Sequence, residues 1–228
     1  MPARQRLSVV LPTLNETAGI APAVQALAPL IARGAQVIVA DGGSTDETVA
    51  CAAACGVQVM RAQRGRALQM NAGAQQASGE VLLFLHADTL LPPQADVLVL
   101  QALAAGGPVW GRFDVRIAGR ARLLPVIAAL MNLRSRCTGI ATGDQAMFIT
   151  RAAFDAVGGF PAQPLMEDIE MSARLLKLSR PACLRAQVVT SGRRWETRGV
   201  WRTVLLMWRL RLAYWCGVAP ERLATLYR

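Results

Sequence analysis

In the first 90 residues, short apolar runs of strand length alternate with longer segments that have helical spacing. The predicted strands and helices follow one another at residues 7–11, 19–33, 37–40, 46–55, 57–60, 67–77 and 81–86. The runs Val-Ile-Val-Ala and Val-Leu-Leu-Phe-Leu, at residues 37–40 and 81–85, are apolar at every position. Such runs are typical of strands that are buried on both faces. The pattern predicts an α/β fold, with a mostly parallel sheet and helices on both of its faces.

The second half of the chain is more hydrophobic and less regular. Its predicted strands lie at residues 110–117 and 146–149, and its predicted helices at residues 167–178 and 200–216. A further apolar segment at residues 123–133 lies between arginines. Because no internal repeat or low-complexity linker interrupts the sequence, we expect a single domain.

Polar residues directly follow the predicted strands. Ligands of parallel sheets bind outside the carboxyl ends of the strands, so these residues are the first candidates for a site. Asp41 ends an apolar strand and precedes Gly42 and Gly43, which permit a tight turn with exposed backbone. Its carboxylate is well placed to accept hydrogen bonds from a base or from ribose hydroxyls. Ser44 and Glu47 have the spacing of a capping box, which predicts the start of a helix.

His86 and Asp88 follow the last of these apolar strands. Side chains two positions apart in an extended chain point to the same side, so the pair has the spacing of metal ligands. A hard divalent cation that bridges a diphosphate needs only one or two protein carboxylates, because phosphate oxygens and water complete its shell. The alternative is that Asp88 caps the next helix and His86 packs against it.

Two further segments carry charge that belongs near the same end of the sheet. Arg66 opens the helix that leads into this strand, and we expect its guanidinium to contact a base or a phosphate. The alternative is that Arg66 lies in an exposed basic turn. Glu167, Asp168 and Glu170 begin a later helix. The helix dipole favours acidic residues at such a start, but it explains one carboxylate more easily than three. One of them is a candidate general base toward an acceptor hydroxyl.

Composition narrows the classes of function. The formal net charge is +10 and comes almost wholly from arginine, which suits an anionic partner such as a nucleotide diphosphate, an acidic lipid or nucleic acid. The five cysteines form no C-x-x-C pair, and the N-terminus lacks the apolar region of a signal peptide, so we expect a cytoplasmic protein. A P-loop, a G-x-G-x-x-G after the first strand and a G-x-S-x-G are all missing, which disfavours P-loop NTPases, dinucleotide enzymes and serine hydrolases.

Four segments together resemble the family 2 glycosyltransferases, which have the GT-A fold. The segments are Leu-Ser-Val-Val-Leu-Pro-Thr-Leu-Asn-Glu, Val-Ala-Asp-Gly-Gly-Ser-Thr-Asp, Gly-Arg-Ala-Leu-Gln-Met-Asn-Ala-Gly and Phe-Leu-His-Ala-Asp. Their order and spacing are more specific than any one of them alone, and the match covers most of the chain. Within the family, the chain most resembles short bacterial transferases that occur beside a radical enzyme and are associated with arsenosugar formation.

The resemblance implies a site for a nucleotide-diphosphate sugar donor of the UDP or GDP type. Arg194 and Trp195 are similar to an Arg-Trp element that cradles the leaving diphosphate in some members. Asp88 becomes the ligand of a divalent metal, Mn²⁺ or Mg²⁺, and His86 stands where the family usually has an acidic residue. The implied lining of the donor site is Pro12, Thr13, Glu16, Asp41, Gly42, Arg66, Ala87, Arg194 and Trp195.

On the acceptor side, the resemblance implies a loop and an acidic pair. The loop is Gly143, Asp144 and Gln145, and the pair is Glu167 and Asp168. Asp168 is then the base of an inverting transfer to a small-molecule or lipid-linked acceptor.

The same resemblance divides the single domain of residues 1–228 into three parts. Residues 1–90 form the donor half, residues 91–195 the acceptor half, and residues 196–228 the C-terminal amphipathic helices. Ser191 stands where processive synthases of the family carry Gln, and their spanning helices are missing. We therefore expect a single, non-processive transfer.

The predicted helix at residues 200–216 carries large apolar side chains on one stripe. Three arginines flank this stripe, which is the composition of an interfacial helix. The segment at residues 123–133 is also flanked by arginines and is too short to span a bilayer. Both segments either contact the cytoplasmic face of the plasma membrane, or pack on the domain or in a homodimer interface. The stripe consists of Trp201, Leu205, Trp208, Leu212 and Trp215, with Arg202, Arg209 and Arg211 beside it.

Two other functions fit parts of the sequence. A nucleotidyltransferase on a similar sheet normally begins with a Gly-rich loop that bears Arg and Lys, which residues 12–16 lack. A basic module that binds a membrane surface without catalysis is the other alternative, and nucleic acid is not an expected partner. We expect a metal-dependent glycosyltransferase.

Overall fold

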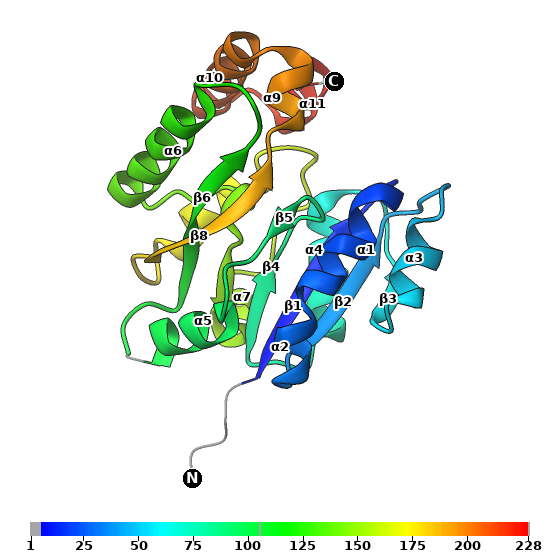
Figure 1. Cartoon of the computed structure of the whole chain (residues 1–228). Helices are drawn as coiled ribbons and strands as arrows, with labels where there is room; N and C mark the ends of the chain where they lie inside the picture. The colour runs from blue at the N-terminus through cyan, green and yellow to red at the C-terminus, as the bar shows by residue number, and fades with distance from the viewer. Residues whose placement is uncertain (1–5, 105, 228) are drawn as a thin grey trace.

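The computed structural model describes residues 6–104 and 106–227, and these residues form one eight-stranded sheet between helices (Figure 1). The strands are β1 (Leu7–Thr13), β2 (Gln36–Asp41), β3 (Gln58–Arg61), β4 (Val81–Phe84), β5 (Thr89–Leu90), β6 (Trp110–Ala118), β7 (Phe148–Thr150) and β8 (Ala182–Ser191). In the sheet they take the order β3-β2-β1-β4-β7-β6-β8-β5.

Helices cover both faces of the sheet, and the last three helices of the chain lie together beyond one end of it (Figure 1). They are α1 (Thr17–Ala26), α2 (Ala28–Ala32), α3 (Thr48–Ala54), α4 (Arg66–Gln76), α5 (Ala95–Ala104), α6 (Leu124–Thr138), α7 (Arg151–Ala156), α8 (Glu167–Leu175), α9 (Arg193–Arg198), α10 (Val200–Trp215) and α11 (Pro220–Tyr227), with a 3-10 turn η1 (Gly143–Gln145).

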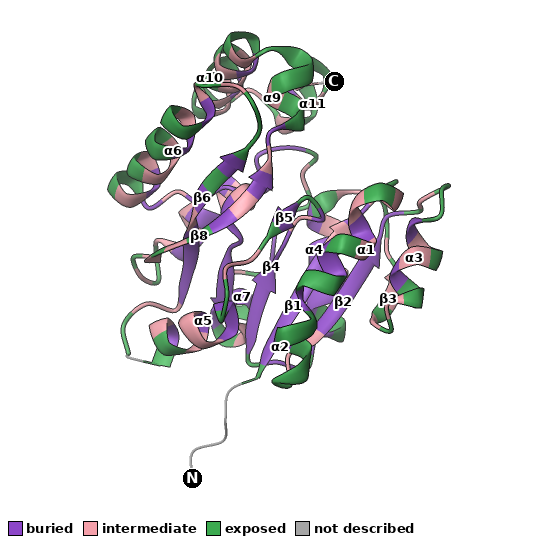
Figure 2. Cartoon of the chain, in the orientation of Figure 1, coloured by how far each residue is buried: buried purple, intermediate pink, exposed green. Residues whose placement is uncertain are grey.

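The parallel half of the sheet follows the predicted pattern. β1 pairs in parallel with both β2 and β4, and β3 pairs in parallel with β2. Successive side chains enter different cores: Val9 and Leu83 join one apolar cluster, whereas Val10 and Leu82 join a second cluster together with Met70 of α4. Figure 2 shows β1, β2 and β4 as buried along most of their length, whereas β3 at the edge of the sheet is half-buried or exposed. Burial on both faces is the reason why residues 37–40 and 81–85 are apolar at every position.

Two predicted helix starts differ from the structure. The helix expected at residues 19–33 begins earlier and is divided into α1 and α2 at Leu27. Pro29, near the start of α2, has no N–H to donate to the preceding turn, which favours a new helix start there. The predicted capping box is wrong. Helix α3 begins only at Thr48, and the Ser44 hydroxyl donates to Asp41 instead of capping the helix.

The second half of the sheet is mixed. β7 runs antiparallel to both β4 and β6, β8 runs parallel to β6, and β5 runs antiparallel to β8. The sequence pattern did not predict β5, β8, α5 or α7. Residues of β8 are mostly half-buried or exposed, so the strand lacks the apolar run that identified the others.

The C-terminal helices pack on the segment that precedes α8. Leu210 of α10 and Leu223 of α11 are buried in one cluster with Leu165, Met166 and Ile169. Figures 1 and 2 place these helices at the same end of the molecule as α6, with exposed outer surfaces. Within the described ranges, no helix combines the length and apolar character needed to cross a bilayer.

Candidate active site

The loops that follow β1 and β2 are joined by hydrogen bonds at the carboxyl ends of these strands. Ser44 Oγ accepts a hydrogen bond from the backbone N–H of Asn15, and Asn15 Oδ1 accepts one from the N–H of Thr45, both at 2.9 Å. The Thr48 hydroxyl accepts the N–H of Glu16 at 2.7 Å. Asn15 adopts a φ of 54°, which asparagine tolerates better than most residues. We call these contacts the loop latch, and they hold the two loops in a fixed relation.

Asp41 lies at the end of β2, opposite Thr13 of β1, and is buried. Its carboxylate accepts hydrogen bonds from the N–H of Gly43 at 2.9 Å, the N–H of Ser44 at 3.0 Å and the Ser44 hydroxyl. These bonds use about three of the four lone-pair positions of a carboxylate. Asp41 therefore shapes the turn, and its contact with a nucleoside stays a prediction.

Gly42 is required by the close approach of a glutamine that the sequence analysis missed. A β-carbon at position 42 would lie 2.9 Å from Cδ of Gln69. The buried Gln69 amide donates to the carbonyl oxygens of Thr13 at 2.7 Å and Ala40 at 2.9 Å. Helix α4 is thereby tied to the ends of β1 and β2. The available signal was the position of this glutamine in the segment that Arg66 opens.

The other predicted donor residues surround the end of β1 and the turn after β4. Pro12 is half-buried, Thr13 and Ala87 are buried, and the Thr13 hydroxyl has no hydrogen-bond partner among the described residues. Burial raises the pKa of Glu16, an arginine of α9 lowers it, and the nearby carboxylate of Asp88 raises it further. The carboxyl groups of Glu16, after β1, and Asp88, after β4, therefore lie close enough to interact electrostatically.

β4 ends before His86 and Asp88, so the alternation of an extended strand does not by itself place their side chains on one side. The His86 ring packs against Gly143, where a β-carbon would lie 2.4 Å from ring atom Cε1. Its Nδ1 lies 3.5 Å from Oδ1 of Asp144. In the described part of the chain, no hydrogen bond or ion pair joins His86 to Asp88. His86 thus packs against the loop of residues 143–145, and its role as a metal ligand stays a prediction.

Asp88 has the properties of a ligand for a divalent cation. Its side chain is exposed, and it accepts only a weak bond of 3.3 Å from the Thr89 hydroxyl. Hard cations prefer such carboxylate oxygens and complete their shell with phosphate oxygens and water. The residues present therefore fit a cation that is held together with a diphosphate. Across residues 6–104 and 106–227, no three His, Cys, Asp or Glu side chains cluster as a metal site.

The predicted acceptor loop forms η1. Gln145 is fully buried, and its side chain completes a capping box with Thr142 and donates to Asn132 at 3.4 Å. Asp144 has 47% of its side chain exposed. Desolvation raises the pKa of Asp144, but the contact with His86 and the charges of Arg66 and Arg194 together lower it, so the pKa lies below its usual value. Gln145 thus holds the loop, and Asp144 faces the site.

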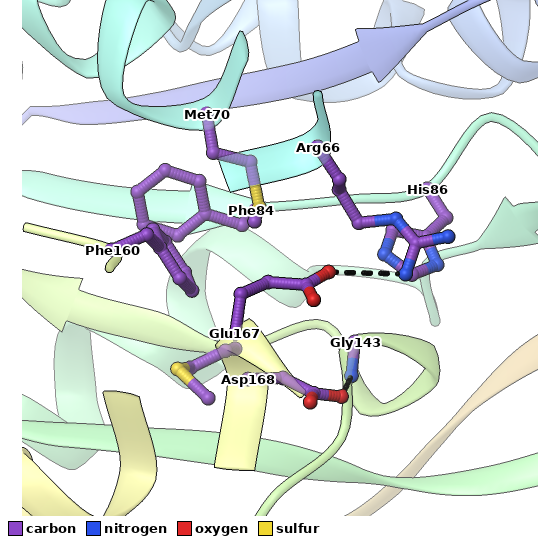
Figure 3. Close-up of a pocket in the computed structure, with 9 residues that line it drawn as sticks. Arg66, Met70, Phe84, His86, Gly143, Phe160, Glu167 and Asp168 are labelled. Atoms are coloured by element: carbon purple, nitrogen blue, oxygen red, sulfur yellow. Dashed lines mark hydrogen bonds and ion pairs between the residues drawn. The ribbon is translucent and has the colours of Figure 1, made fainter. Parts of the chain in front are cut away.

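Glu167 and Asp168 begin α8 and have separate partners (Figure 3). Glu167 is buried and accepts a hydrogen bond from Nη1 of Arg66 at 3.1 Å, although the Arg66 side chain remains 44% exposed. The carboxylate of Asp168 accepts the N–H of Gly143 at 2.9 Å on one oxygen and the N–H of Ile169 at 2.8 Å on the other. The acidic pair therefore joins three elements, which are α4, η1 and α8.

Burial raises the pKa of Asp168 to about 6, and the negative charge of Glu167 contributes in the same direction. The N–H of Gly143 and the charge of Arg66 lower the pKa in part. A carboxylate with this pKa is mostly ionised at neutral pH and is a stronger base than an ordinary aspartate. A cavity of about 10 Å³ lies beside it, lined by Arg66, Met70, Phe84, His86, Gly143, Met147, Phe160, Glu167 and Asp168.

Helix α9 follows β8 directly and brings Arg194 to the edge of the site. Burial lowers the pKa of Arg194, while the carboxylates of Asp144 and Asp88 raise it. The guanidinium lies over the ring of Tyr227, with 4.9 Å between Cζ and the ring centroid. Trp195 is half-buried and packs against the apolar core. Arg194 thus reaches the predicted region, whereas a role for Trp195 at the diphosphate stays a prediction.

A charged network behind the acceptor loop was missed by the sequence analysis. Arg112 of β6 is fully buried, and both Arg112 and Arg136 of α6 bind the carboxylate of Asp114. Arg136 also donates to the carbonyl oxygen of Cys183 at 3.2 Å. The available signal was the charge of Arg112 and Asp114 inside the otherwise apolar strand predicted at 110–117.

Helix α6 adds two further polar residues to this network. Asn132 accepts the N–H of Val115 at 2.9 Å and donates to its carbonyl oxygen at 3.0 Å. Arg134 has two buried guanidinium nitrogens, Nε and Nη2, without a hydrogen-bond partner in the described residues. Burial lowers the pKa of Arg134, and the negative charge of Asp168 raises it. The base candidate therefore lies within the field of a half-buried arginine that has two buried nitrogens without a partner in the described residues.

Known proteins with similar sequences are glycosyltransferases. An uncharacterized glycosyltransferase of Mycobacterium tuberculosis is 30% identical over 196 residues, which cover 81% of this chain and 74% of that protein. Glucosyl-3-phosphoglycerate synthase of the same species is 34% identical over 102 residues, which cover 40% of this chain and 31% of that protein.

Solved structures show the same fold at lower identity. A mannosyltransferase from Pyrobaculum calidifontis in complex with GDP-Man and Mn²⁺ gives a TM-score of 0.65 at 21% identity, covering 93% of this chain and 62% of that one. S. aureus TarS in complex with UDP gives 0.68 at 19% identity, covering 82% and 60%. The chain thus spans less than two thirds of these two proteins. The predicted GT-A fold with a helical C-terminal segment is confirmed.

The family assignment rests on the sequence match. Residues 8–156 match the family model described as glycosyl transferase family 2, which is more than half of the chain. The matched region begins in β1, includes the loop latch and Asp88, and ends after the acceptor loop. The chain belongs to glycosyltransferase family 2.

Proposed function

We propose that this chain transfers a sugar from a nucleotide-diphosphate donor of the UDP or GDP type to an acceptor hydroxyl, in a single step with inversion. The observation that carries the proposal is the base candidate Asp168, whose pKa of about 6 suits proton abstraction near neutral pH. It lies beside the acceptor loop and is linked to the donor half through the Arg66–Glu167 pair.

The proposed base is held in place by its neighbours. The N–H groups of Gly143 and Ile169 bind one carboxylate oxygen each and fix the orientation of Asp168. Each oxygen keeps lone-pair capacity for the acceptor hydroxyl. Asp168 takes the proton of the acceptor hydroxyl while the hydroxyl oxygen attacks the anomeric carbon of the donor sugar. The bond from this carbon to the nucleoside diphosphate breaks on the opposite side, so the configuration is inverted.

The leaving nucleoside diphosphate needs positive charge. Arg66 and Arg194 lie at the edge of the site and supply part of it. A divalent cation, Mn²⁺ or Mg²⁺, held by Asp88 would neutralise further negative charge on the diphosphate. The solved relatives with Mn²⁺ or Mg²⁺ and a nucleotide support this part of the proposal.

The nucleoside lies, in this proposal, against the end of β1 and the loop latch. Pro12, Thr13, Glu16, Asp41 and Gly42 form this wall. The buried Thr13 hydroxyl, without a partner in the described residues, supports a polar contact there. Because the latch is already bonded, nucleoside binding requires little ordering of these loops.

The acceptor class is a separate part of the proposal. The resemblance to short bacterial transferases associated with arsenosugar formation supports a small-molecule acceptor, and the apolar, arginine-flanked C-terminal helices support a lipid-linked one. A transfer assay with acceptors of both classes separates them, because only one should accelerate donor turnover.

The function is tested by a donor screen followed by two substitutions. Donor hydrolysis across UDP and GDP sugars, with and without Mn²⁺, identifies the donor. Asp168→Asn should then lower transfer by about 10²- to 10⁴-fold, with nucleotide binding by calorimetry unchanged. Asp88→Asn should lower both transfer and Mn²⁺-dependent nucleotide binding. The exposed Asp155 on α7 provides the matched control, Asp155→Asn, which should change neither. Full transfer after either site substitution refutes the scheme.

A further inference from the structure

Helix α10 has apolar side chains on two opposite sides, and within residues 6–104 and 106–227 only one of these sides is covered. The inner side includes Thr203 and Leu210, which are buried, and Met207, which packs against the same cluster. At about 100° per residue, the outer side holds three tryptophans and two leucines. We call it the α10 outer row: Trp201, Leu205, Trp208, Leu212 and Trp215.

The α10 outer row is strongly exposed. The exposed fractions are 67% for Trp201, 60% for Leu205, 69% for Trp208, 64% for Leu212 and 76% for Trp215. One exposed apolar side chain is ordinary on a protein surface, but a continuous row of five large ones indicates a binding surface. The alternative that this row packs on the catalytic domain does not hold in the structure.

The charges around the row are positive. Arg202 and Arg209 flank it on one side and Arg211 on the other, and α10 contains no acidic residue. Residues 193–227 contain seven arginines and only two acidic residues, Glu196 and Glu221. A groove of about 610 Å³ runs beside the row, between α9, α10 and α11. Its lining includes four arginines and no acidic residue: Arg194, Thr197, Arg198, Arg202, Thr203, Leu205, Leu206, Met207, Arg209, Leu226 and Tyr227.

This charge pattern decides between two occupants of the row. A second copy of the chain would bring the arginines of both copies together across a symmetric contact, and like charges in an interface are unfavourable. An anionic bilayer is complementary instead. Tryptophan prefers the interface between hydrocarbon and headgroups, and arginine reaches from that depth to lipid phosphates. Basic residues near the surface add attraction to anionic lipids.

We infer that α10 is an interfacial helix, which lies in the headgroup region of an anionic membrane with the α10 outer row toward the hydrocarbon and lipid phosphates in the arginine-lined groove. The exposed row Val126, Leu130 and Leu133 of α6 lies at the same end of the molecule (Figure 2). Arg194 lines the groove and also faces Asp88 and Asp144 of the proposed site. A docked membrane therefore lies next to the edge of that site.

The inference is tested by flotation of the full chain with vesicles of phosphatidylcholine, with and without phosphatidylglycerol. Wild-type protein should float with the anionic vesicles and much less with the neutral ones. Trp208→Asp should lower the bound fraction at least about tenfold, because a charge replaces the central aromatic anchor. Ile31→Asp is the matched control, since Ile31 is another exposed apolar residue, on α2, and should bind as wild type.

The contribution of charge is tested separately. Arg202→Glu with Arg209→Glu should lower flotation with anionic vesicles, and high salt should weaken wild-type binding. Arg6→Glu, an exposed arginine before β1, should leave binding unchanged. Equal folding of the variants is checked by circular dichroism and thermal midpoint.

Three results overturn the inference. The first is wild-type protein that does not float with anionic vesicles, and the second is a Trp208→Asp variant that floats as well as wild type. The third is a homodimer in light scattering that Trp208→Asp dissociates, without any vesicle binding by the wild type. That outcome assigns the row to a second copy of the chain. None of these readouts depends on glycosyl transfer, so failure here leaves the proposed function standing.

Discussion

The proposed donor and acceptor sides of the site differ in how their charged and polar groups are paired. On the proposed donor side, Asp41 is bonded in the turn after β2 and Asn15 in the loop latch, and the buried side-chain atoms without a partner in the described residues are the hydroxyls of Thr13 and Thr17. On the acceptor side, Asp168 has a pKa raised to about 6 and Arg134 has two buried nitrogens without a partner in the same residues. The carboxylate and amide of the proposed donor side are thus bonded within the protein, whereas the proposed acceptor side keeps a carboxylate with a raised pKa.

The physical reason lies in what each side has to do. A nucleoside pocket gains affinity when its loops are already ordered, because binding then costs little conformational entropy. A general base must be poorly solvated to keep a raised pKa, which places an unfavourable charge in the folded protein. The structure therefore concentrates its electrostatic strain around α6, η1 and α8, where the proposed chemistry takes place.

Of the predictions that test this difference between the two sides, the pH dependence of transfer should show the largest change. Asp168 must be ionised to act as a base, so kcat/KM should fall about tenfold for each pH unit below about 6. Glu167→Gln removes the negative neighbour and should move the midpoint to lower pH. Glu80→Gln, an exposed acid outside the site, is the control. An unchanged midpoint in Glu167→Gln would contradict the coupling of the acidic pair.

The same pKa shift predicts the sign of a stability change. Because the pKa of Asp168 is raised on folding, the folded state binds more protons between about pH 4 and pH 6, and its free energy of unfolding falls as the pH rises through that range. Asp168→Asn removes the charge but sets its NH2 against the backbone N–H of Gly143 or Ile169 at every pH, so the thermal midpoint of the variant relative to wild type should be higher at pH 7 than at pH 4 by a few degrees. A difference between variant and wild type that is equal at both pH values would show that the ionised carboxylate is not strained.

The loop latch should give an intermediate effect. Asn15→Ala removes the acceptor for the Thr45 N–H and the tolerance for a positive φ, so stability should fall by about 1 kcal/mol. Nucleotide binding should weaken by about three- to tenfold, because the loops lose their fixed order. Asn15→Asp keeps the acceptor and should recover most of both losses. Calorimetry that gives equal nucleotide affinity for all three proteins would refute a prepared donor side.

Two arginines on α6 should differ in their effect on stability, although both lie near the proposed base. Arg134→Met removes unpaired buried N–H groups and should leave stability unchanged or raise it by up to about 1 kcal/mol. Arg136→Met breaks the bonds to Asp114 and Cys183 and should lower stability by about 1 kcal/mol or more. Urea unfolding measures both, and equal losses would mean that Arg134 is as well paired as Arg136.

Part of the site was predictable because it depends on strand ends. Glu16 follows β1, Asp41 ends β2 and Asp88 follows β4. The apolar runs and the parallel sheet predicted these positions. The direction of His86 was not predictable, because it depends on where β4 ends and on the approach of Gly143 from a distant loop. The polar pairs around α6 were missed for the same reason, since Arg112 and Arg136 meet only across the fold.

The sequence by itself determined the parallel half of the sheet, the family and the positions of the main charged residues. Periodicity and strand ends are local, so residues 7–11, 37–40 and 81–86 could be identified without any partner. Only the tertiary structure decided which groups are buried together. It gave Asp168 its raised pKa and left the outer side of α10 uncovered, because desolvation and surface exposure depend on contacts between segments that are distant in sequence.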